Sequence, residues 1–135
     1  MSMKVLLVEP DWRFARMACR YLESHAHLVV PQPQPQQALD HARRWHPDLV
    51  IVAAELAEND FLRSLTALRP RPAVLMTAWP DRCDVTWRAW QVGGDELLMK
   101  PVFHAGELHE AVVTARENAA AGARRVRGRG LAASA

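Results

Sequence analysis

The sequence PDLVIVAAEL, residues 47–56, decides the fold that we predict for this chain. A Pro-Asp pair opens it, and six apolar residues, 49–54, follow without interruption. Such a run, rich in β-branched side chains and too short for a helix, is typical of a strand buried on both faces of a parallel sheet. Ligands gather beyond the carboxyl ends of parallel strands. We therefore expect any functional site close to Ala53, Ala54 and Glu55, where the run ends.

Length and composition fit one folded domain. The chain has 135 residues, of which 50% are hydrophobic, enough for a single core. Its longest uncharged apolar run is the one just described, and the unbroken apolar run before Glu9 at the N-terminus has only four residues, 5–8, so neither a membrane span nor a signal peptide fits. We predict a cytoplasmic protein that does not contact membranes.

The positive charge is concentrated in a C-terminal tail. The net charge is +2, yet four of the 17 basic residues are arginines in residues 122–135, which contain no acidic residue. Residues 1–121 thus carry 13 basic and 15 acidic groups. We predict a folded domain over residues 1–121 and a disordered basic tail over residues 122–135. This distribution of charge disfavours nucleic-acid binding by the folded domain. A rival hypothesis is that nucleic acid binds to the arginine tail.

Short apolar runs alternate with amphipathic segments along the whole domain. Strands are predicted at residues 4–8, 27–30, 49–54, 73–77 and 97–99, and helices at residues 12–23, 36–45, 59–69, 81–92 and 107–121. Asp11 can cap the first helix, and Gly93-Gly94 can form a C-cap at the end of the fourth. Five alternating strand and helix units predict an α/β fold with a doubly wound parallel sheet and helices on both faces.

Four separated segments then carry a resemblance to a known family. They are KVLLVEPD in the first strand, PDLVIV in the third, MTA in the fourth and GGDELLMKP around the fifth. Together they resemble the receiver domain of two-component response regulators over about residues 3–118. The resemblance implies the flavodoxin-like sheet order 2-1-3-4-5.

The resemblance also implies which residues occupy the phosphorylation pocket. In the family, two acids after the first strand hold Mg²⁺, an aspartate after the third strand accepts a phosphoryl group from a histidine kinase, and a hydroxyl and a lysine contact the phosphoryl oxygens. The matching residues here are Glu9, Pro10, Ala53, Thr77 and Lys100.

Two of these five positions have lost the chemistry of the family. Phosphoryl transfer needs an oxygen nucleophile in line and a cation to neutralise the equatorial oxygens. The methyl group of Ala53 is no nucleophile, and Glu9 beside Pro10 leaves one carboxylate for the metal. We therefore predict a pseudo-receiver with no catalytic residue, no enzymatic activity, no cofactor, and weak or absent Mg²⁺ binding.

Lys100 needs a new partner in this altered pocket, because a partly buried ammonium without one is costly. Our hypothesis is that Glu9 or Glu55 pairs with it. Glu55 is otherwise expected to be a solvated loop residue. A rival hypothesis keeps phosphorylation and places the phosphoryl group on an unorthodox acid such as Glu55 or Asp60.

The aromatic residues suggest where a partner binds. Trp87 and Trp90 occupy apolar positions of the fourth predicted helix, so we expect core packing, with Trp90 the more buried. Trp79 follows the fourth strand, where its ring either covers the pocket or packs as an ordinary loop residue. The family uses the fourth helix, fifth strand and fifth helix as its output face. The residues that would form this face here are Trp87, Leu97, Val102 and Phe103, with Leu97 replacing the switch aromatic.

The function predicted from these residues is that of a stand-alone receiver-like protein in bacterial signal transduction, which contacts a protein partner without being phosphorylated. Homodimerisation through the output face is an alternative form of that contact. The six histidines lack the spacing of helical metal ligands, so we predict no metal site and imidazoles that are solvated or locally bonded. A nucleotide-binding cleft is disfavoured because no glycine-rich turn follows the first strand.

Overall fold

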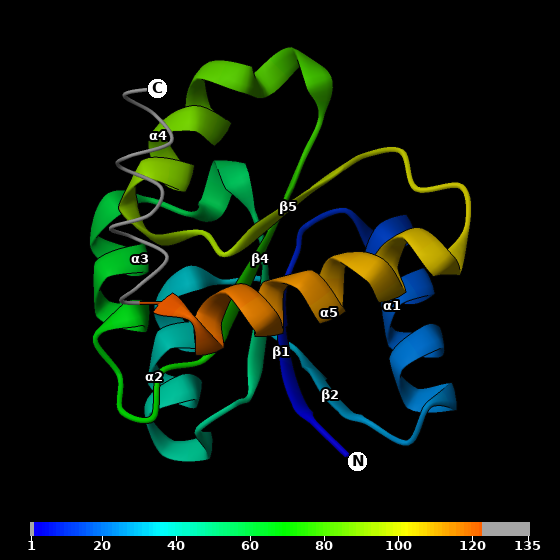
Figure 1. Cartoon of the computed structure of the whole chain (residues 1–135), viewed down its shortest axis with the longest axis horizontal. Coiled ribbons are helices and arrows are strands. Elements are labelled where there is room, and N and C mark those ends of the chain that lie inside the picture. Colours follow the sequence, from blue (N-terminus) through cyan, green and yellow to red (C-terminus); the bar gives the residue numbers. More distant parts are fainter. Residues whose placement is uncertain (1, 123–135) are drawn as a thin grey trace.

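The computed structural model describes residues 2–122, apart from the side chains of Asn59 and of five residues in α4. The elements alternate as predicted (Figure 1). Their bounds are β1 Lys4–Val8, α1 Trp12–Ser24, β2 Leu28–Pro31, α2 Pro35–Trp45, β3 Leu49–Ala53, α3 Asn59–Thr66, β4 Ala73–Ala78, α4 Cys83–Gly93, β5 Glu96–Met99 and α5 Ala105–Ala120, with 3-10 turns at Ala54–Leu56 and Pro80–Arg82. Residues 123–135 are not among the described residues, so the structure does not test the prediction that the basic tail is disordered.

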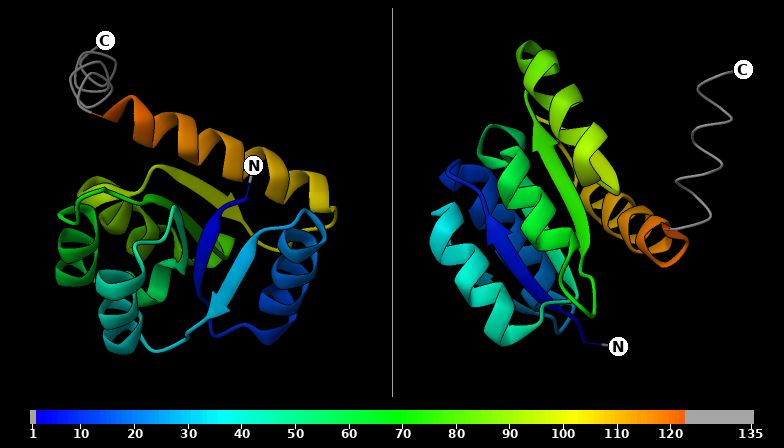
Figure 2. Two further views of the ribbon diagram at one scale, coloured as in Figure 1. Left: turned by 90° about the horizontal axis from the view of Figure 1, so that it is seen from below. Right: turned by 90° about the vertical axis from the view of Figure 1, so that its left-hand side faces the viewer.

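The five strands form one parallel sheet in the order β2-β1-β3-β4-β5. Helices α1 and α5 cover one face, and α2, α3 and α4 cover the other (Figure 2). The predicted doubly wound, flavodoxin-like fold and its strand order are confirmed. Because β3 lies at the centre of the sheet, the apolar run at residues 49–54 is buried over its whole length.

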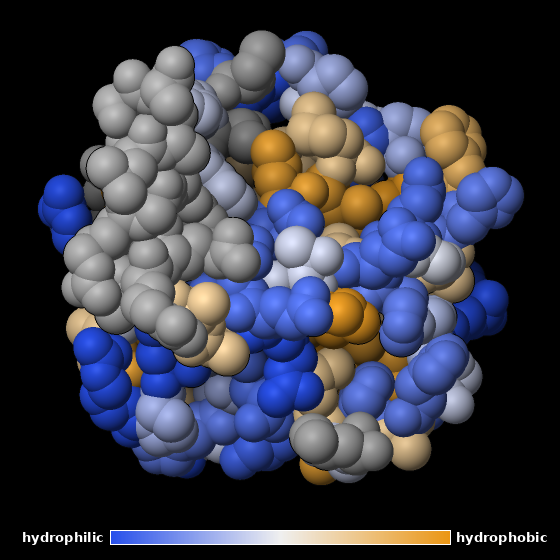
Figure 3. Space-filling view, in the orientation of Figure 1, coloured by the Kyte–Doolittle hydropathy of each residue, from blue (hydrophilic) through white to orange (hydrophobic). Residues whose placement is uncertain are grey.

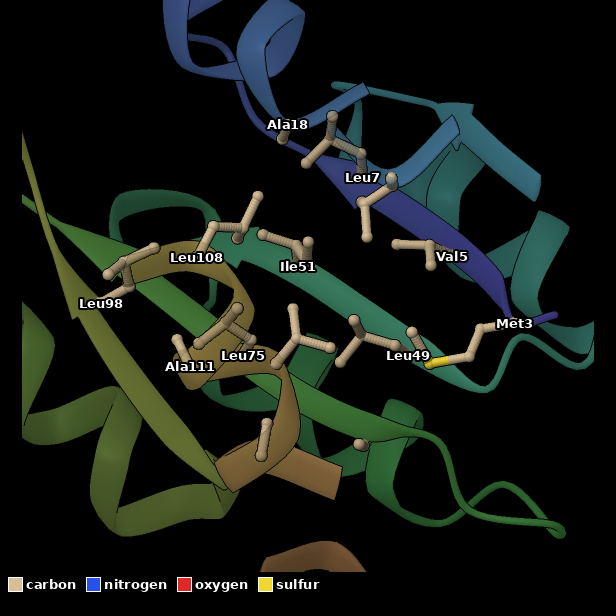
Figure 4. Close-up of a cluster of buried hydrophobic side chains, with 14 of the residues drawn as sticks. Met3, Val5, Leu7, Ala18, Leu49, Ile51, Leu75, Leu98, Leu108 and Ala111 are labelled. Carbon is tan, nitrogen blue, oxygen red and sulfur yellow. The ribbon is translucent and has the colours of Figure 1, made fainter. Parts of the chain in front are cut away.

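Each face of β3 contributes to a different core. Leu49 and Ile51 pack with residues of α1 and α5 (Figure 4). Val50 and Val52 point the other way and pack with residues of α2 and α3. This alternation follows from the two-residue period of a strand, and it explains why an unbroken apolar run was needed here.

The glycine pair at the end of α4 ends this helix, as predicted. Gly93 is the last residue of α4, and Gly94 is its C-cap, with an extended backbone of φ −73° and ψ 140°. What Gly94 provides is room, because a Cβ there would lie 2.7 Å from the Cε of Met76 and 3.0 Å from the Cε3 of Trp90. Its small size lets the end of α4 approach β4 closely.

A buried carboxylate secures the edge of the sheet where strands β4 and β5 begin. Asp95 accepts hydrogen bonds from both terminal nitrogens of Arg71, at 2.8 and 3.2 Å, and from the backbone N–H of Val74 at 2.8 Å. The Asn118 side chain donates to the Asp95 carbonyl at 2.6 Å. These bonds connect β4, β5 and α5, and leave the opposite edge free for the site.

Candidate functional site

The carboxyl edge of the sheet brings three of the predicted pocket residues together. Glu9 directly follows β1, Thr77 lies near the end of β4 beside Ala53, and Lys100 directly follows β5. Glu9, Thr77 and Lys100 are all buried. Parallel strands end at a common edge, which is why residues far apart in sequence converge here.

The Glu9 carboxylate is the centre of this cluster. Its Oε1 lies 3.0 Å from the Lys100 Nζ and accepts the backbone N–H of Asp11 at 3.1 Å. Its Oε2 accepts the Thr77 hydroxyl at 2.6 Å. Both carboxylate oxygens are therefore engaged by charge-assisted hydrogen bonds.

The Lys100 ammonium is enclosed on several sides. Its Nζ lies 5.2 Å from the centre of the Trp79 ring and 5.7 Å from that of Phe14, distances that allow cation–π attraction. Asp11 Oδ2 is a second, longer partner at 3.9 Å. Only 2% of the Lys100 side chain is exposed, so the pair with Glu9 is shielded from water. Trp79 thus covers the pocket, the first of the two interpretations of this ring.

The other predicted pocket residues lie around the cluster without joining its hydrogen bonds. Ala53 is fully buried at the end of β3, and Pro10 is exposed. Glu55 is exposed on the 3-10 turn that follows β3, and it forms no salt bridge with any residue that the structure describes. The hypothesis of a new partner for Lys100 is confirmed for Glu9 and wrong for Glu55. The strand stops at Ala53, so the residue two positions later no longer faces the pocket.

Sequence reasoning identified Asp11 only as a helix cap. Its Oδ1 does cap α1, accepting from the backbone N–H groups of Arg13 and Phe14 at 3.1 and 3.4 Å. The same residue also donates its N–H to Glu9 and stands near Lys100. The signal was its position, since an acid two residues after Glu9 lies in the turn that leaves β1. Phe14 gave no such signal, because its apolar position in α1 predicts core packing.

The predicted output face carries exposed hydrophobic groups. Trp87 is 61% exposed and Phe103 is 76% exposed, and Met99 at the end of β5 is 42% exposed. Leu97 and Val102 are half-buried against the cores. Figure 3 shows hydrophobic residues gathered over the region of β5 and hydrophilic residues around them.

Core packing of Trp87 is the second prediction that the structure overturns. A surface helix buries only part of its circumference, and in α4 Trp90 is partly buried against the core. Trp87 is 61% exposed and faces solvent. Trp90 is the more buried of the two tryptophans, as predicted.

Three of the histidines, His25, His27 and His109, take part in local hydrogen bonds. His27 Nδ1 accepts the Met3 N–H at 3.0 Å, and His109 Nδ1 lies 2.5 Å from the Tyr21 hydroxyl. Burial, followed by nearby positive groups, lowers the pKa of His27, which favours the neutral ring that this acceptor role needs. Among the side chains that the structure describes, no three from histidine, cysteine or acidic residues converge as metal ligands. No helix in residues 2–122 has the length and apolar character to cross a membrane.

Sequence comparison gives distant relatives. No family model matches the chain. A protein-glutamate methylesterase/protein-glutamine glutaminase of Shigella boydii is 27% identical over 106 residues, which are 74% of this chain and 34% of that protein. The chain thus spans about a third of the length of the curated relatives it matches.

Comparison with solved structures finds proteins whose fold matches most of this chain. NtrX from Brucella abortus, solved in complex with ADP, superposes with a TM-score of 0.78 and 20% identity over 95% of this chain and 29% of its own. A CheY-like response regulator receiver domain protein from Methanospirillum hungatei gives a TM-score of 0.74 and 18% identity over 90% of this chain and 100% of its own. The chain therefore has the fold of response regulator receiver domains, with Glu9, Thr77 and Lys100 bonded to one another at the edge where that fold places its ligands.

Proposed function

We propose that this protein is a pseudo-receiver that works in the cytoplasm by contact with a protein partner, without being phosphorylated. Its place would be in bacterial two-component signalling, which the receiver fold and the receiver domains among its structural neighbours favour. The observation that carries the proposal is the buried Glu9 carboxylate, which holds Thr77 and Lys100 at the end of β3 next to Ala53.

The pocket is unsuited to phosphoryl transfer for two reasons. Ala53 offers no oxygen to attack phosphorus, and Thr77 and Lys100 are already bonded to a carboxylate that belongs to the protein. A phosphoryl group would have to displace Glu9 from both, leaving its buried negative charge without a partner.

Magnesium binding meets the same obstacle. Mg²⁺ is usually held by one or two carboxylates together with several waters and phosphate oxygens. Here both oxygens of Glu9 are engaged, and the Asp11 side chain, which is 25% exposed, lies beside the positive charge of Lys100. We therefore propose that Mg²⁺ binding is weak or absent.

Incubation with acetyl phosphate and Mg²⁺, followed by intact-protein mass spectrometry, tests the absence of phosphorylation. We expect no covalent phosphoryl group, because the pocket lacks a nucleophile. A receiver domain that has its acceptor aspartate serves as the positive control and should be labelled under the same conditions. Labelling that disappears in Glu55→Gln or Asp60→Asn would instead establish an unorthodox acceptor.

We further propose that the partner contacts the face formed by Trp87, Leu97, Val102 and Phe103. Exposed aromatic side chains are enriched at binding sites and contribute much of the binding energy. Trp87 and Phe103 are the two most exposed of these four residues. Leu97 has no aromatic ring that could switch between buried and exposed positions, so the face would be available permanently.

The double substitution Trp87→Ala and Phe103→Ala tests this face. We expect it to weaken partner binding at least about tenfold, as loss of two aromatic anchors does at other interfaces. Partners retained from a lysate of the source cell are compared between wild type, the double variant and Leu28→Ala, a control with an exposed apolar residue on the edge strand β2. Sedimentation velocity of the same three proteins shows whether the partner is a second copy. Equal retention by all three proteins would contradict the assignment of the face.

A further inference from the structure

A groove of about 740 Å³ lies on the outer surface of α1 and reaches the start of α5 (Figure 1). Its volume is in the range of small-molecule sites, although it is open to solvent. Neither Glu9 nor Lys100 lines it, so it is separate from the buried pocket at the edge of the sheet. We call it the α1 groove. Its main lining residues are Trp12, Arg13, Arg16, Met17, Arg20 and Tyr21.

The charged side chains that line the α1 groove are all positive. Arg13, Arg16 and Arg20 are exposed, and none of them forms a salt bridge with a residue in the described part of the chain. Glu23 is the next acid on the same side of α1, and it does not line the groove. Guanidinium groups bind phosphate oxygens through paired hydrogen bonds, so these arginines favour a phosphate-bearing ligand.

Two of these arginines are direct neighbours on the helix. Arg16 and Arg20 are four residues apart, which places their Cβ atoms about 5–6 Å from each other. Like charges at this spacing destabilise a helix, and an anion bound between them offsets the repulsion. The ligand should therefore carry several negative charges close together, as successive groups of a polyphosphate chain do.

An aromatic ring lies at the other end of the same row. Trp12, Arg16 and Arg20 follow at i, i+4 and i+8 along one side of α1, a length of about 12 Å. The Trp12 side chain is 65% exposed, and the Arg13 guanidinium lies 5.5 Å from the centre of its ring. The α1 groove thus offers a flat stacking surface at one end and two neighbouring positive charges at the other.

Nucleoside polyphosphates combine the two features that this surface complements. Nucleobases stack on tryptophan rings and on arginine guanidinium planes, and this stacking tolerates any base. The phosphate chain attached through the ribose then extends toward Arg16 and Arg20. A phosphate cleft at the edge of the sheet needs a glycine-rich turn, but none is needed here, because side chains rather than backbone N–H groups would contact the phosphates.

We propose that the α1 groove binds a nucleoside polyphosphate, with its base on the Trp12 ring and its phosphates against Arg16 and Arg20. Inorganic polyphosphate would leave the Trp12 ring uncovered. Duplex nucleic acid fits less well, because residues 1–121 carry two more acidic than basic groups. The inference does not depend on the proposed function, since it concerns a separate surface and holds whether or not the buried pocket takes a phosphoryl group.

Isothermal titration calorimetry of the full chain with ATP and with GTP tests the proposal. Omitting Mg²⁺ keeps the phosphate charges free and excludes metal-dependent binding at the edge of the sheet. Inorganic triphosphate and adenosine are titrated separately, because each carries only one of the two parts of the nucleotide. We expect saturable binding of both nucleotides, at least about fivefold tighter than that of triphosphate because the base stacks, and no measurable binding of adenosine.

Substitutions in the α1 groove separate its two ends. Arg16→Glu/Arg20→Glu is expected to weaken ATP binding at least about tenfold, whereas Trp12→Ala should weaken ATP about fivefold and leave triphosphate binding unchanged. The charge-matched control Arg44→Glu/Arg63→Glu changes exposed arginines of α2 and α3 and should bind ATP as wild type does. Circular dichroism and urea unfolding confirm that each variant is folded.

Three results would overturn the proposal. The first is that neither nucleotide binds wild type saturably. The second is that the groove reversal and the control reversal have equal effects, which would place the nucleotide elsewhere on the chain. The third is that triphosphate binds as tightly as ATP, which would show attraction of polyanions without recognition of the base. None of these measurements involves phosphorylation or the Trp87 face, so failure here leaves the proposed function standing.

Discussion

Replacing Lys100 with methionine is expected to lower the free energy of unfolding by about 3–5 kcal/mol, the cost typical of breaking a buried ion pair by removing one partner. The Glu9 carboxylate would keep the Thr77 hydroxyl and the Asp11 N–H but lose the only cation within 4.0 Å in the described residues. Methionine retains most of the apolar length of the lysine side chain, so the change isolates the charge. Urea unfolding at neutral pH measures the effect.

A second substitution at Glu9 shows whether the pair itself causes the loss. In Glu9→Gln/Lys100→Met neither charge remains, and glutamine can still accept the Thr77 hydroxyl. We expect this double variant to be at least about 1–2 kcal/mol more stable than the sum of the two single losses implies. Arg43→Met breaks the exposed salt bridge to Asp40 and should change stability by no more than about 0.5 kcal/mol. Additive losses at Glu9 and Lys100 would contradict a coupled pair.

Asp95→Ala is expected to be the second most damaging change, lowering the free energy of unfolding by roughly 2–4 kcal/mol. It removes a buried carboxylate that accepts from Val74 and from both terminal nitrogens of Arg71. The Val74 N–H would then have no acceptor in the interior of the sheet. Urea unfolding measures the loss, and faster hydrogen exchange of the Val74 amide locates it.

The exposed acid Asp60 provides the control for Asp95. Its nearest cationic partner, Arg63, lies 4.0 Å away, and the side chain is fully solvated. Asp60→Ala should therefore change stability by less than about 0.5 kcal/mol. If Asp95→Ala were equally mild, the hydrogen bonds at the start of β4 and β5 would not be what secures this edge.

The alternation of strands and helices and the two covered faces were predictable because each segment has a clear hydrophobic period, whereas the strand order was implied by the resemblance to receiver domains. The run at residues 49–54 is apolar at every position, which only a strand buried on both faces requires. The pairing of Lys100 with Glu9 was also within reach, since an enclosed ammonium needs a carboxylate and few acids lie at that edge. Local pattern and the cost of unpaired charge carried these predictions.

The features that escaped prediction depend on contacts distant in sequence. The apolar pattern of α4 does not predict that Trp90 packs against the sheet and Trp87 faces solvent. Which of the two is buried depends on how the helix is rotated about its axis where it packs against the sheet. Gly94 lies so close to Met76 that a Cβ there would meet its side chain, and the pairing of Asp95 with Arg71 joins residues 24 positions apart. Such arrangements are set by the assembled sheet.

The closed pocket has a consequence for how the protein can act. A buried ion pair is weak evidence for high stability, and we propose that its role here is to fix one arrangement of the groups that it joins. Thr77 and Lys100 are both held by Glu9. Under this proposal the pocket keeps that arrangement without a phosphoryl group, and the binding surface is permanently available.

We propose that the Glu9, Thr77 and Lys100 side chains bond to one another and leave no site for a phosphoryl group. Amide ¹⁵N–¹H NMR spectra recorded during titration with beryllofluoride and Mg²⁺, a non-covalent mimic of the phosphoryl group, test it most directly. We expect no saturable shift of the Ala54, Ala78 and Lys100 amides, which border the pocket. A saturable, Mg²⁺-dependent shift of these amides, absent with either component alone, would contradict it.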